Sequence, residues 1–224
     1  MARSLSIVLP AYNEEARLGP ALDELFGYLR RRGDKAREGE PGSAELPSDI
    51  RVLVVDDGST DRTPEIVRER AEISDPGAPA SLRVLSVPHG GKGAAVRAGM
   101  LDADADVIVF ADADMATPPD ELVRLVRSLE TADIALGSRI QPDGSDMRKT
   151  QPVWRRLLGK AFHLLASAWV VGPVQDTQCG FKGFTREAAH DLFARQKITS
   201  IVFDVELIHL ARRRGYRVDV VPIR

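Results

Sequence analysis

The sequence predicts a single α/β domain in which a mostly parallel sheet is flanked by helices. Short runs of aliphatic and β-branched residues alternate with segments whose apolar residues recur at helical spacing. This alternation is typical of right-handed βαβ crossovers. Polar clusters follow the predicted strands at their carboxyl ends, the edge at which such sheets bind ligands. We therefore expect one active site, built where these clusters converge.

The first 140 residues contain five predicted strands. These strands are Ser6–Pro10, Arg51–Val55, Arg83–Val87, Val107–Phe110 and Asp133–Gly137. Helices are predicted over 14–32, after Ser59–Asp61, from about Ala94 and over 118–130. The first helix carries an apolar stripe formed by Leu18, Leu22, Leu25, Phe26 and Leu29. Residues 33–50 and 74–81 are rich in Gly, Pro and charge, which predicts surface loops.

Beyond residue 140 the pattern changes. Helices are predicted at about 152–170, 186–195 and 203–214, followed by a last strand over 217–223. The intervening basic stretch, residues 139–160, could steer an anionic substrate or form a solvated helix face.

Composition excludes several classes of protein. The 224 residues include 43% hydrophobic and 29% charged residues and have a net charge of −2, so a general nucleic-acid binder is not expected. Cys179 is the only cysteine, which excludes an intrachain disulfide and fits a cytoplasmic compartment. Residues 161–174 are too short and too interrupted for a membrane-spanning helix. We expect a cytoplasmic protein and leave peripheral contact with the membrane face open.

The segment Asp112-Ala113-Asp114 follows the fourth predicted strand and is the predicted catalytic centre. Two carboxylates at a strand end can converge on one hard cation, Mg²⁺ or Mn²⁺, which prefers oxygen ligands. Such a metal would neutralise a leaving diphosphate. An Asp-x-Asp pair in a solvent-exposed turn is the plainer alternative.

Two further clusters bear on nucleotide binding. Asp56-Asp57-Gly58-Ser59 offers carboxylates to a base or a ribose, although part of it also reads as a helix cap and turn. Gly90-Gly91-Lys92-Gly93 is similar to phosphate-binding loops but lacks the Walker A spacing. No Gly-x-Gly-x-x-Gly follows the first strand, which argues against a dinucleotide oxidoreductase.

Taken together, these segments resemble the family 2 inverting glycosyltransferases of the Rossmann-like GT-A fold. They are most similar to the polyprenyl-phosphate (dolichyl-phosphate) glucosyl- and mannosyltransferases. The residues that carry the resemblance are Leu9–Glu15, Val55–Asp61, Gly91–Gly93, Asp112–Asp114, Gly137–Arg139 and Asp176–Lys182. The resemblance implies a nucleotide-binding part over 1–140 and an acceptor-side part over 141–224.

The resemblance also implies roles for individual residues. Those expected to contact the donor are Pro10, Ala11, Tyr12, Glu14, Asp56, Asp57, Gly58, Lys92 and Asp112–Asp114, with Asp112 and Asp114 also holding the metal. Those expected to act on the acceptor phosphate are Arg139, Arg155, Arg156 and Gln178. Asp176 either orients acceptor or sugar, or caps a helix.

The implied reaction is displacement at the anomeric carbon by a phosphate oxygen of a polyprenyl phosphate. Since that phosphate is already ionised, a strong general base is unnecessary, and positioning by Arg139 together with the metal suffices. The mannosyltransferases carry a glutamine where this chain has Ala116, which favours UDP-glucose over GDP-mannose as the donor. A nucleotidyltransferase and a non-catalytic sugar-nucleotide-binding module remain the alternatives from other classes.

Glu206, the four histidines and Cys179 are the remaining residues with an expected role. Glu206 either faces the sugar hydroxyls or pairs with an arginine. The four histidines show no metal-ligand spacing and are expected to be structural. Cys179 is expected to be a packed thiol rather than a nucleophile.

Overall fold

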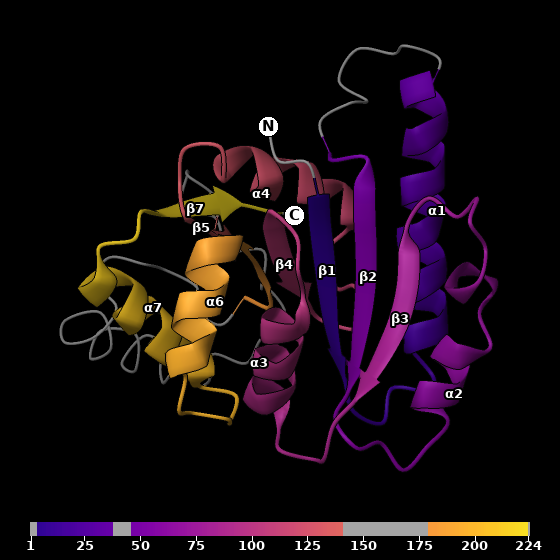
Figure 1. Ribbon diagram of the computed structural model, residues 1–224, viewed down its shortest axis with the longest axis horizontal. Helices are drawn as coiled ribbons and strands as arrows, with labels where there is room; N and C mark the ends of the chain where they lie inside the picture. Colours follow the sequence, from indigo (N-terminus) through magenta and orange to yellow (C-terminus); the bar gives the residue numbers. More distant parts are fainter. Residues whose placement is uncertain (1–3, 38–45, 141–178, 224) are drawn as a thin grey trace.

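The computed structural model describes residues 4–37, 46–140 and 179–223. They form a seven-stranded sheet in the order β3-β2-β1-β4-β6-β5-β7, with helices on both faces (Figure 1). The strands are β1 (Ser4–Ala11), β2 (Asp49–Asp56), β3 (Ser81–Ser86), β4 (Val107–Ala111), β5 (Ile134–Ser138), β6 (Phe181–Thr185) and β7 (Val218–Pro222). The helices are α1 (Leu18–Arg37), α2 (Thr63–Arg68), α3 (Lys92–Asp102), α4 (Leu122–Ser128), α6 (Arg186–Arg195) and α7 (Phe203–Arg214), with 3₁₀ turns η2 (Ala71–Ile73) and η3 (Pro119–Glu121).

The predicted mostly parallel α/β sheet is confirmed. Strand β1 pairs in parallel with β2 and β4, and β2 pairs in parallel with β3. Every residue of β1 is buried, as expected for a strand covered on both faces. In this register Ala11 lies beside Asp56, so the carboxyl ends of β1 and β2 meet at one edge. The same edge receives the end of β4, because Val8 pairs with Phe110.

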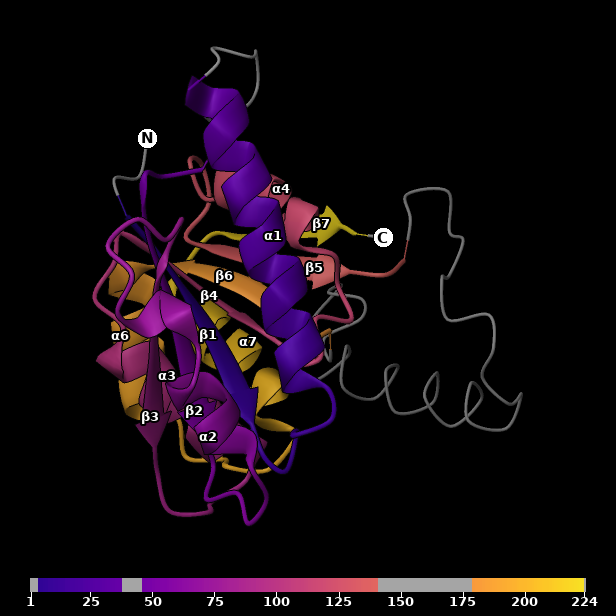
Figure 2. The same ribbon diagram turned by 90° about the vertical axis from the view of Figure 1, so that its right-hand side faces the viewer.

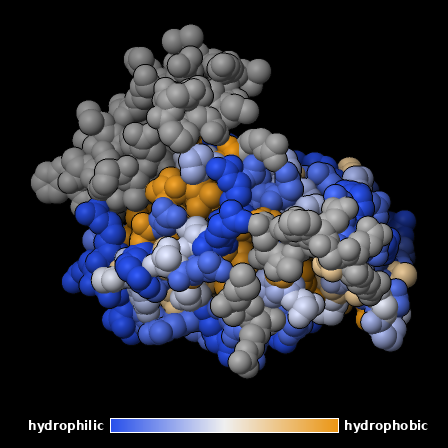
Figure 3. All heavy atoms as spheres, turned by 90° about the horizontal axis from the view of Figure 1, so that it is seen from above, coloured by the Kyte–Doolittle hydropathy of each residue, from blue (hydrophilic) through white to orange (hydrophobic). Residues whose placement is uncertain are grey.

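Two helical layers enclose the sheet. Helices α1, α2 and α4 pack on one face and α3, α6 and α7 on the other, each over its own hydrophobic core (Figures 1 and 2). The predicted apolar stripe of α1 is buried in the first core, where Leu18, Leu22 and Leu25 are fully inaccessible to solvent. Seen from above, the described residues present a hydrophilic surface interrupted by several apolar patches (Figure 3).

Strand β6 is the main departure from the sequence prediction, which placed no strand between residues 140 and 217. It runs antiparallel between β4 and β5, with Phe110 opposite Lys182 and Ala135 opposite Gly183. Because β6 runs in the opposite direction to β4, its first residues lie where β4 ends. The amide of Asp112 accordingly donates to the carbonyl of Gly180 at 3.1 Å.

Several predicted boundaries also shift. Helix α1 begins at Leu18 rather than at residue 14 and extends to Arg37, so the beginning of the predicted 33–50 loop is helical. The helix predicted over 118–130 is divided into η3 and α4. The helix predicted at about 152–170 lies outside the described residues. Among the described residues, none of the helices combines the length and apolar character required to cross a membrane.

Candidate active site

An open cleft lies at the carboxyl ends of β1, β2 and β4, beside the start of α3. Its volume is about 370 Å³, within the range of roughly 300–1,000 Å³ common for ligand sites. The lining residues are Pro10, Ala11, Tyr12, Glu14, Asp57, His89, Gly91, Lys92, Ala95, Asp112, Ala113 and Asp114. The structure therefore brings together most of the predicted donor residues. Asp56 and Gly58 are next to this lining, at the end of β2.

The loops after β1 and β2 hold each other in place by hydrogen bonds. The Asn13 amide donates to the Ser59 hydroxyl at 3.0 Å, and the Thr60 amide donates to the Asn13 side-chain oxygen at 2.9 Å. The Glu14 amide donates to the Thr63 hydroxyl at 2.8 Å. Asn13 has a φ of 53°, a left-handed conformation that Asn tolerates better than most residues. These hydrogen bonds hold residues 13–14 against the loop after β2, and helix α1 begins four residues later, at Leu18.

Asp57 anchors the glycine loop that precedes α3. Its side chain is almost wholly buried, and its two carboxylate oxygens accept from the amides of Gly90 and Gly91 at 2.8 and 3.0 Å. Asp56 is buried beside it and accepts from the Ser59 amide at 3.0 Å. The contacts give Asp57 a positioning role that the sequence did not predict. The predicted role in reading the base stays a prediction.

A stacked pair of rings forms one wall of the cleft. The rings of Tyr12 and His89 lie 4.2 Å apart at 24°, and the Tyr12 side chain is substantially exposed. Nδ1 of His89 lies 2.9 Å from a carboxylate oxygen of Asp57. Gly58 has a φ of 70°, and a Cβ at this position would lie only 2.9 Å from the backbone nitrogen of His89. An exposed aromatic face of this kind suits stacking of a planar base.

The first turn of α3 is held from the opposite side by residues 196–199. The Gly93 amide donates to the Thr199 carbonyl at 2.8 Å, and the Gln196 side chain donates to the Gly93 carbonyl at 2.9 Å. Glu206 fixes this segment by accepting from the amides of Lys197 and Ile198 at 3.0 and 2.7 Å. Glu206 is not among the residues that line the cleft, and its two predicted roles, facing the sugar hydroxyls or pairing with an arginine, stay predictions.

Asp112 and Asp114 leave β4 in a tight turn and face the cleft. The turn places Met115 at a φ of 48°, and its amide donates to the Asp112 carbonyl at 3.0 Å. Asp112 pairs with the Lys92 ammonium at 2.5 Å, and Asp114 lies 3.6 Å from the Arg17 guanidinium. Both aspartate side chains remain more than one third exposed. Each carboxylate is thus paired with a cation yet accessible from the cleft.

The donor set at this turn fits a divalent cation. Carboxylate oxygens are hard ligands of the kind that Mg²⁺ and Mn²⁺ prefer. No third His, Cys, Asp or Glu completes a metal-binding group in the parts of the chain that the structure describes. Since Mg²⁺-type sites commonly use one or two carboxylates together with substrate phosphates, a bound diphosphate would supply the remaining ligands. Ala116 offers no ligand through its side chain, and its amide donates to Asp114 at 3.2 Å.

Of the residues predicted to act on the acceptor phosphate, the structure describes Arg139 alone. Arg139 follows β5, is half-buried, and is not among the residues that line the cleft. The other residues predicted to act on the acceptor or the sugar, namely Arg155, Arg156, Asp176 and Gln178, lie outside the described residues. Their roles stay predictions.

Three features of the site were not predicted from the sequence. His89 was expected to be structural, but it lies on the cleft wall; its place directly before the glycine loop was the available signal. Arg17 follows Glu14 at helical spacing and pairs with it at 2.7 Å as well as approaching Asp114. The buried pair Lys182–Asp204 joins residues 22 positions apart, and no local pattern points to it. Cys179 is buried, as predicted for a packed thiol.

Comparison with known proteins decides the family. The profile described as Glycosyl transferase family 2 matches residues 6–193. The chain belongs to this family. The predicted resemblance is thereby confirmed, and with it the GT-A fold.

Several similar sequences are dolichyl-phosphate beta-glucosyltransferases. A dolichyl-phosphate beta-glucosyltransferase of Trichomonas vaginalis is 40% identical over 97% of this chain and 62% of its own length. Proteins of the same description from Drosophila melanogaster and Homo sapiens are 37% and 35% identical, over 98% and 94% of this chain and 66% and 63% of their own lengths. The chain thus spans slightly less than two thirds of the length of these relatives.

Solved structures support the fold. Glucosyl-3-phosphoglycerate synthase of Mycobacterium tuberculosis, in complex with Mn²⁺, UDP-glucose and phosphoglyceric acid, aligns with a TM-score of 0.66 at 23% identity, over 98% of this chain and 69% of that one. A Pyrobaculum calidifontis mannosyltransferase with GDP-Man and Mn²⁺ aligns at 0.58 and 23% identity, over 99% of this chain and 55% of that one. Divalent metal is therefore found in structures of this fold.

Proposed function

We propose that the chain transfers glucose from UDP-glucose to a polyprenyl phosphate such as dolichyl phosphate, with inversion at the anomeric carbon. The observation that carries this proposal is the 35–40% identity, over nearly the whole chain, to proteins described as dolichyl-phosphate beta-glucosyltransferases. The cleft supports it, because an exposed aromatic face, a lysine and two exposed aspartates lie along one opening.

In this proposal, different residues of the cleft bind different parts of the nucleotide-sugar donor. The uridine binds against Pro10, Tyr12 and the loop after β2 that contains Asp57. The exposed ring of Tyr12 is available for stacking. Lys92 pairs with Asp112, and we assign it to the diphosphate. A divalent metal held by Asp112 and Asp114 would neutralise the charge that develops on the leaving diphosphate.

The reaction is a single displacement. An oxygen of the acceptor phosphate forms a bond to the anomeric carbon while the bond from that carbon to the diphosphate oxygen breaks, and UDP leaves with the electron pair. The acceptor is ionised near neutral pH, so positioning and charge stabilisation dominate catalysis. We assign the positioning of the acceptor to Arg139 and to the predicted residues 155, 156, 176 and 178.

A polyprenyl acceptor determines where the proposed reaction takes place. Its phosphate lies at a membrane surface because its hydrocarbon chain stays in the bilayer. We therefore propose a peripheral position at the cytoplasmic face, with residues 1–140 serving the donor and residues 141–224 the acceptor.

Transfer of labelled glucose tests the proposal. With UDP-glucose, Mn²⁺ and dolichyl phosphate, label should pass into a lipid-extractable product and equimolar UDP should be released. Asp114→Asn should lower this rate at least about 100-fold, the scale expected when a stabilising group is lost at a site of developing charge. Asp75→Asn is the matched control, since Asp75 also accepts an amide, that of Gly77 at 2.8 Å, but lies outside the cleft.

The same assay separates the alternatives. Transfer from GDP-mannose and not from UDP-glucose would identify a mannosyltransferase. Binding of UDP-glucose without turnover would identify a binding module, and pyrophosphate release from a nucleoside triphosphate would identify a nucleotidyltransferase. Full activity in Asp114→Asn would refute the metal assignment.

A further inference from the structure

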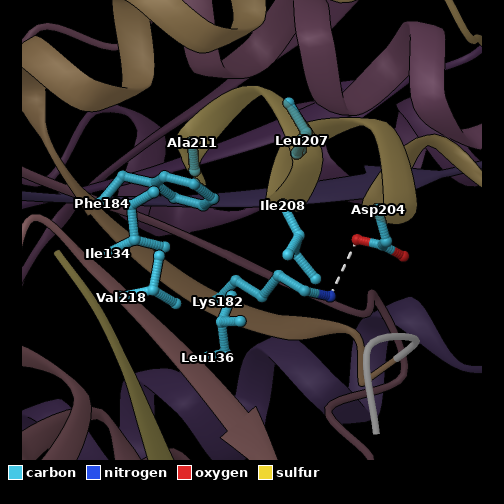
Figure 4. A pocket seen from close by; sticks show the side chains of 9 residues that line it. All are labelled: Ile134, Leu136, Lys182, Phe184, Asp204, Leu207, Ile208, Ala211 and Val218. Carbon is cyan, nitrogen blue, oxygen red and sulfur yellow. Dashed lines mark ion pairs between the residues drawn. The ribbon is translucent and has the colours of Figure 1, made fainter. Parts of the chain in front are cut away.

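Lys182 is a fully buried lysine directly beneath the candidate active site. It lies in β6 opposite Phe110 of β4, and only 1% of its side chain is exposed. Its neighbours are mainly apolar and line a narrow cavity (Figure 4). They are Ile134, Leu136, Phe184, Leu207, Ile208, Ala211 and Val218. Burying a charge in such surroundings is costly unless the charge is paired and hydrogen-bonded.

Among the residues that the structure describes, the ammonium of Lys182 contacts two polar groups. It lies 2.8 Å from a carboxylate oxygen of Asp204, in the first turn of α7, and Figure 4 shows the two side chains pointing toward each other. It also donates to the backbone carbonyl of Cys179, three residues earlier in the chain. The aromatic ring of Phe110 lies 5.3 Å away, within the range of a cation–π contact.

Lys182 binds the carbonyl of Cys179, and the segment formed by residues 179–180 contacts Asp112. Cys179 is followed by Gly180, whose carbonyl accepts from the Asp112 amide at 3.1 Å. The Asp112 carboxylate packs so closely on Gly180 that a Cβ there would lie 2.1 Å from a carboxylate oxygen. Contacts thus run continuously from Asp204 through Lys182 and residues 179–180 to Asp112.

We propose that the buried Lys182–Asp204 pair is a positioning device that fixes residues 179–180 and thereby sets the place of the Asp112 carboxylate. The proposal rests on the proposed function, because it assigns Asp112 to the metal and donor. Lys182 and Asp204 are positioning residues, since neither lines the cleft.

A purely stabilising role is a poor explanation for this pair. Replacing a buried ion pair by apolar side chains of similar volume is often neutral or stabilising, and the surrounding cavity is already apolar. What apolar side chains cannot supply is the hydrogen bond to the Cys179 carbonyl. Burial raises the pKa of Asp204, and the Lys182 ammonium opposes that shift.

The test variant is Lys182→Met/Asp204→Leu, which fills the cavity with apolar side chains and removes the bond to Cys179. Its control is Ile208→Val, which alters packing in the same cavity without changing a polar contact. Mn²⁺ binding in the presence of UDP is followed by the electron paramagnetic resonance signal of free Mn²⁺, and folding by thermal melting. We expect a melting temperature close to that of the wild type and Mn²⁺ affinity weakened about tenfold or more, the size seen when outer partners of metal ligands are removed. Ile208→Val should leave Mn²⁺ affinity within about twofold.

The readout separates this inference from the proposed function. Failure of the wild-type protein to bind Mn²⁺ with UDP would overturn the proposed function. Binding by the wild type with unchanged affinity in the folded double variant would overturn the positioning role alone. If the double variant does not fold, Asp204→Asn, which keeps the volume and removes the countercharge, replaces it. Unchanged Mn²⁺ affinity in Asp204→Asn would then overturn the inference, and a weakened affinity without a matching loss in Ile208→Val would support it.

Discussion

The two ends of the cleft are built in different ways. The loop end, residues 12–14, 57–59 and 89–91, is fixed by hydrogen bonds between backbone and short side chains, centred on the buried Asp57. The carboxylate end, Lys92, residues 112–114 and Gly180, is held by ion pairs and by close packing on a glycine. The loop end is therefore organised before a ligand arrives. The carboxylate end is held by cations that a bound metal would replace.

The largest effect is expected from the packing at the carboxylate end. In Gly180→Ala the new methyl group would occupy the space of the Asp112 carboxylate, so that side chain must move. Displacing a reacting group by about 1 Å can cost roughly 100-fold in rate, and we expect a fall of that size or more in kcat/KM for glucose transfer. Steady-state kinetics with saturating lipid acceptor would measure it.

A glycine with free space provides the control. Gly33 lies in α1, and an added Cβ would meet no heavy atom within 4 Å. Gly33→Ala should leave kcat/KM unchanged and should not lower the melting temperature, because alanine favours a helix over glycine. Wild-type kinetics in Gly180→Ala would show that the carboxylate end tolerates movement, and the contrast between the two ends would disappear.

A smaller effect, on binding rather than turnover, is expected at the loop end. In Asp57→Asn one carboxylate oxygen becomes an amide NH₂ group that opposes the N–H of Gly90 or Gly91. An unsatisfied buried donor costs about 1–3 kcal/mol, so the KM for UDP-glucose should rise roughly tenfold while kcat changes little. Asp75→Asn, which perturbs an equivalent amide contact on an exposed loop, should change neither constant. A fall in kcat at constant KM would place Asp57 in the chemistry instead.

The loop end was largely predictable from the sequence, and the reason is local. Strands β1, β2 and β4 are short aliphatic runs, and their polar clusters follow directly, so the common edge comes from the parallel topology alone. The positions of Tyr12, Asp57 and Asp112 required no knowledge of distant contacts. His89 was missed because a single histidine before glycines has no periodicity to interpret.

The support beneath the carboxylate end was not predictable in the same way. Strand β6 has Lys182 and Gly183 at its centre, residues that are uncommon in buried strands, and it pairs with β4 about 70 residues earlier. Only the tertiary pairing with Asp204 makes the lysine acceptable there. Family resemblance identified residues 176–182 as important but gave no physical reason for Lys182. Non-local contacts supplied that reason.

The smallest expected effect concerns the rim of the loop end, at Asp61. Burial raises the pKa of Asp61, but hydrogen bonds from the Thr63 hydroxyl, the Thr63 amide and the Glu15 amide outweigh it and hold the pKa below its usual value. A carboxyl with a lowered folded-state pKa stabilises the fold above the unfolded pKa, and this contribution is lost as pH falls through the folded pKa. Asp61→Asn should therefore lower the free energy of unfolding by on the order of 1 kcal/mol near neutral pH. Urea denaturation of both proteins at falling pH should show the difference shrinking toward zero. A difference that stayed constant with pH would mean that the charge of Asp61 contributes nothing, and that shape alone orders this part of the loop end.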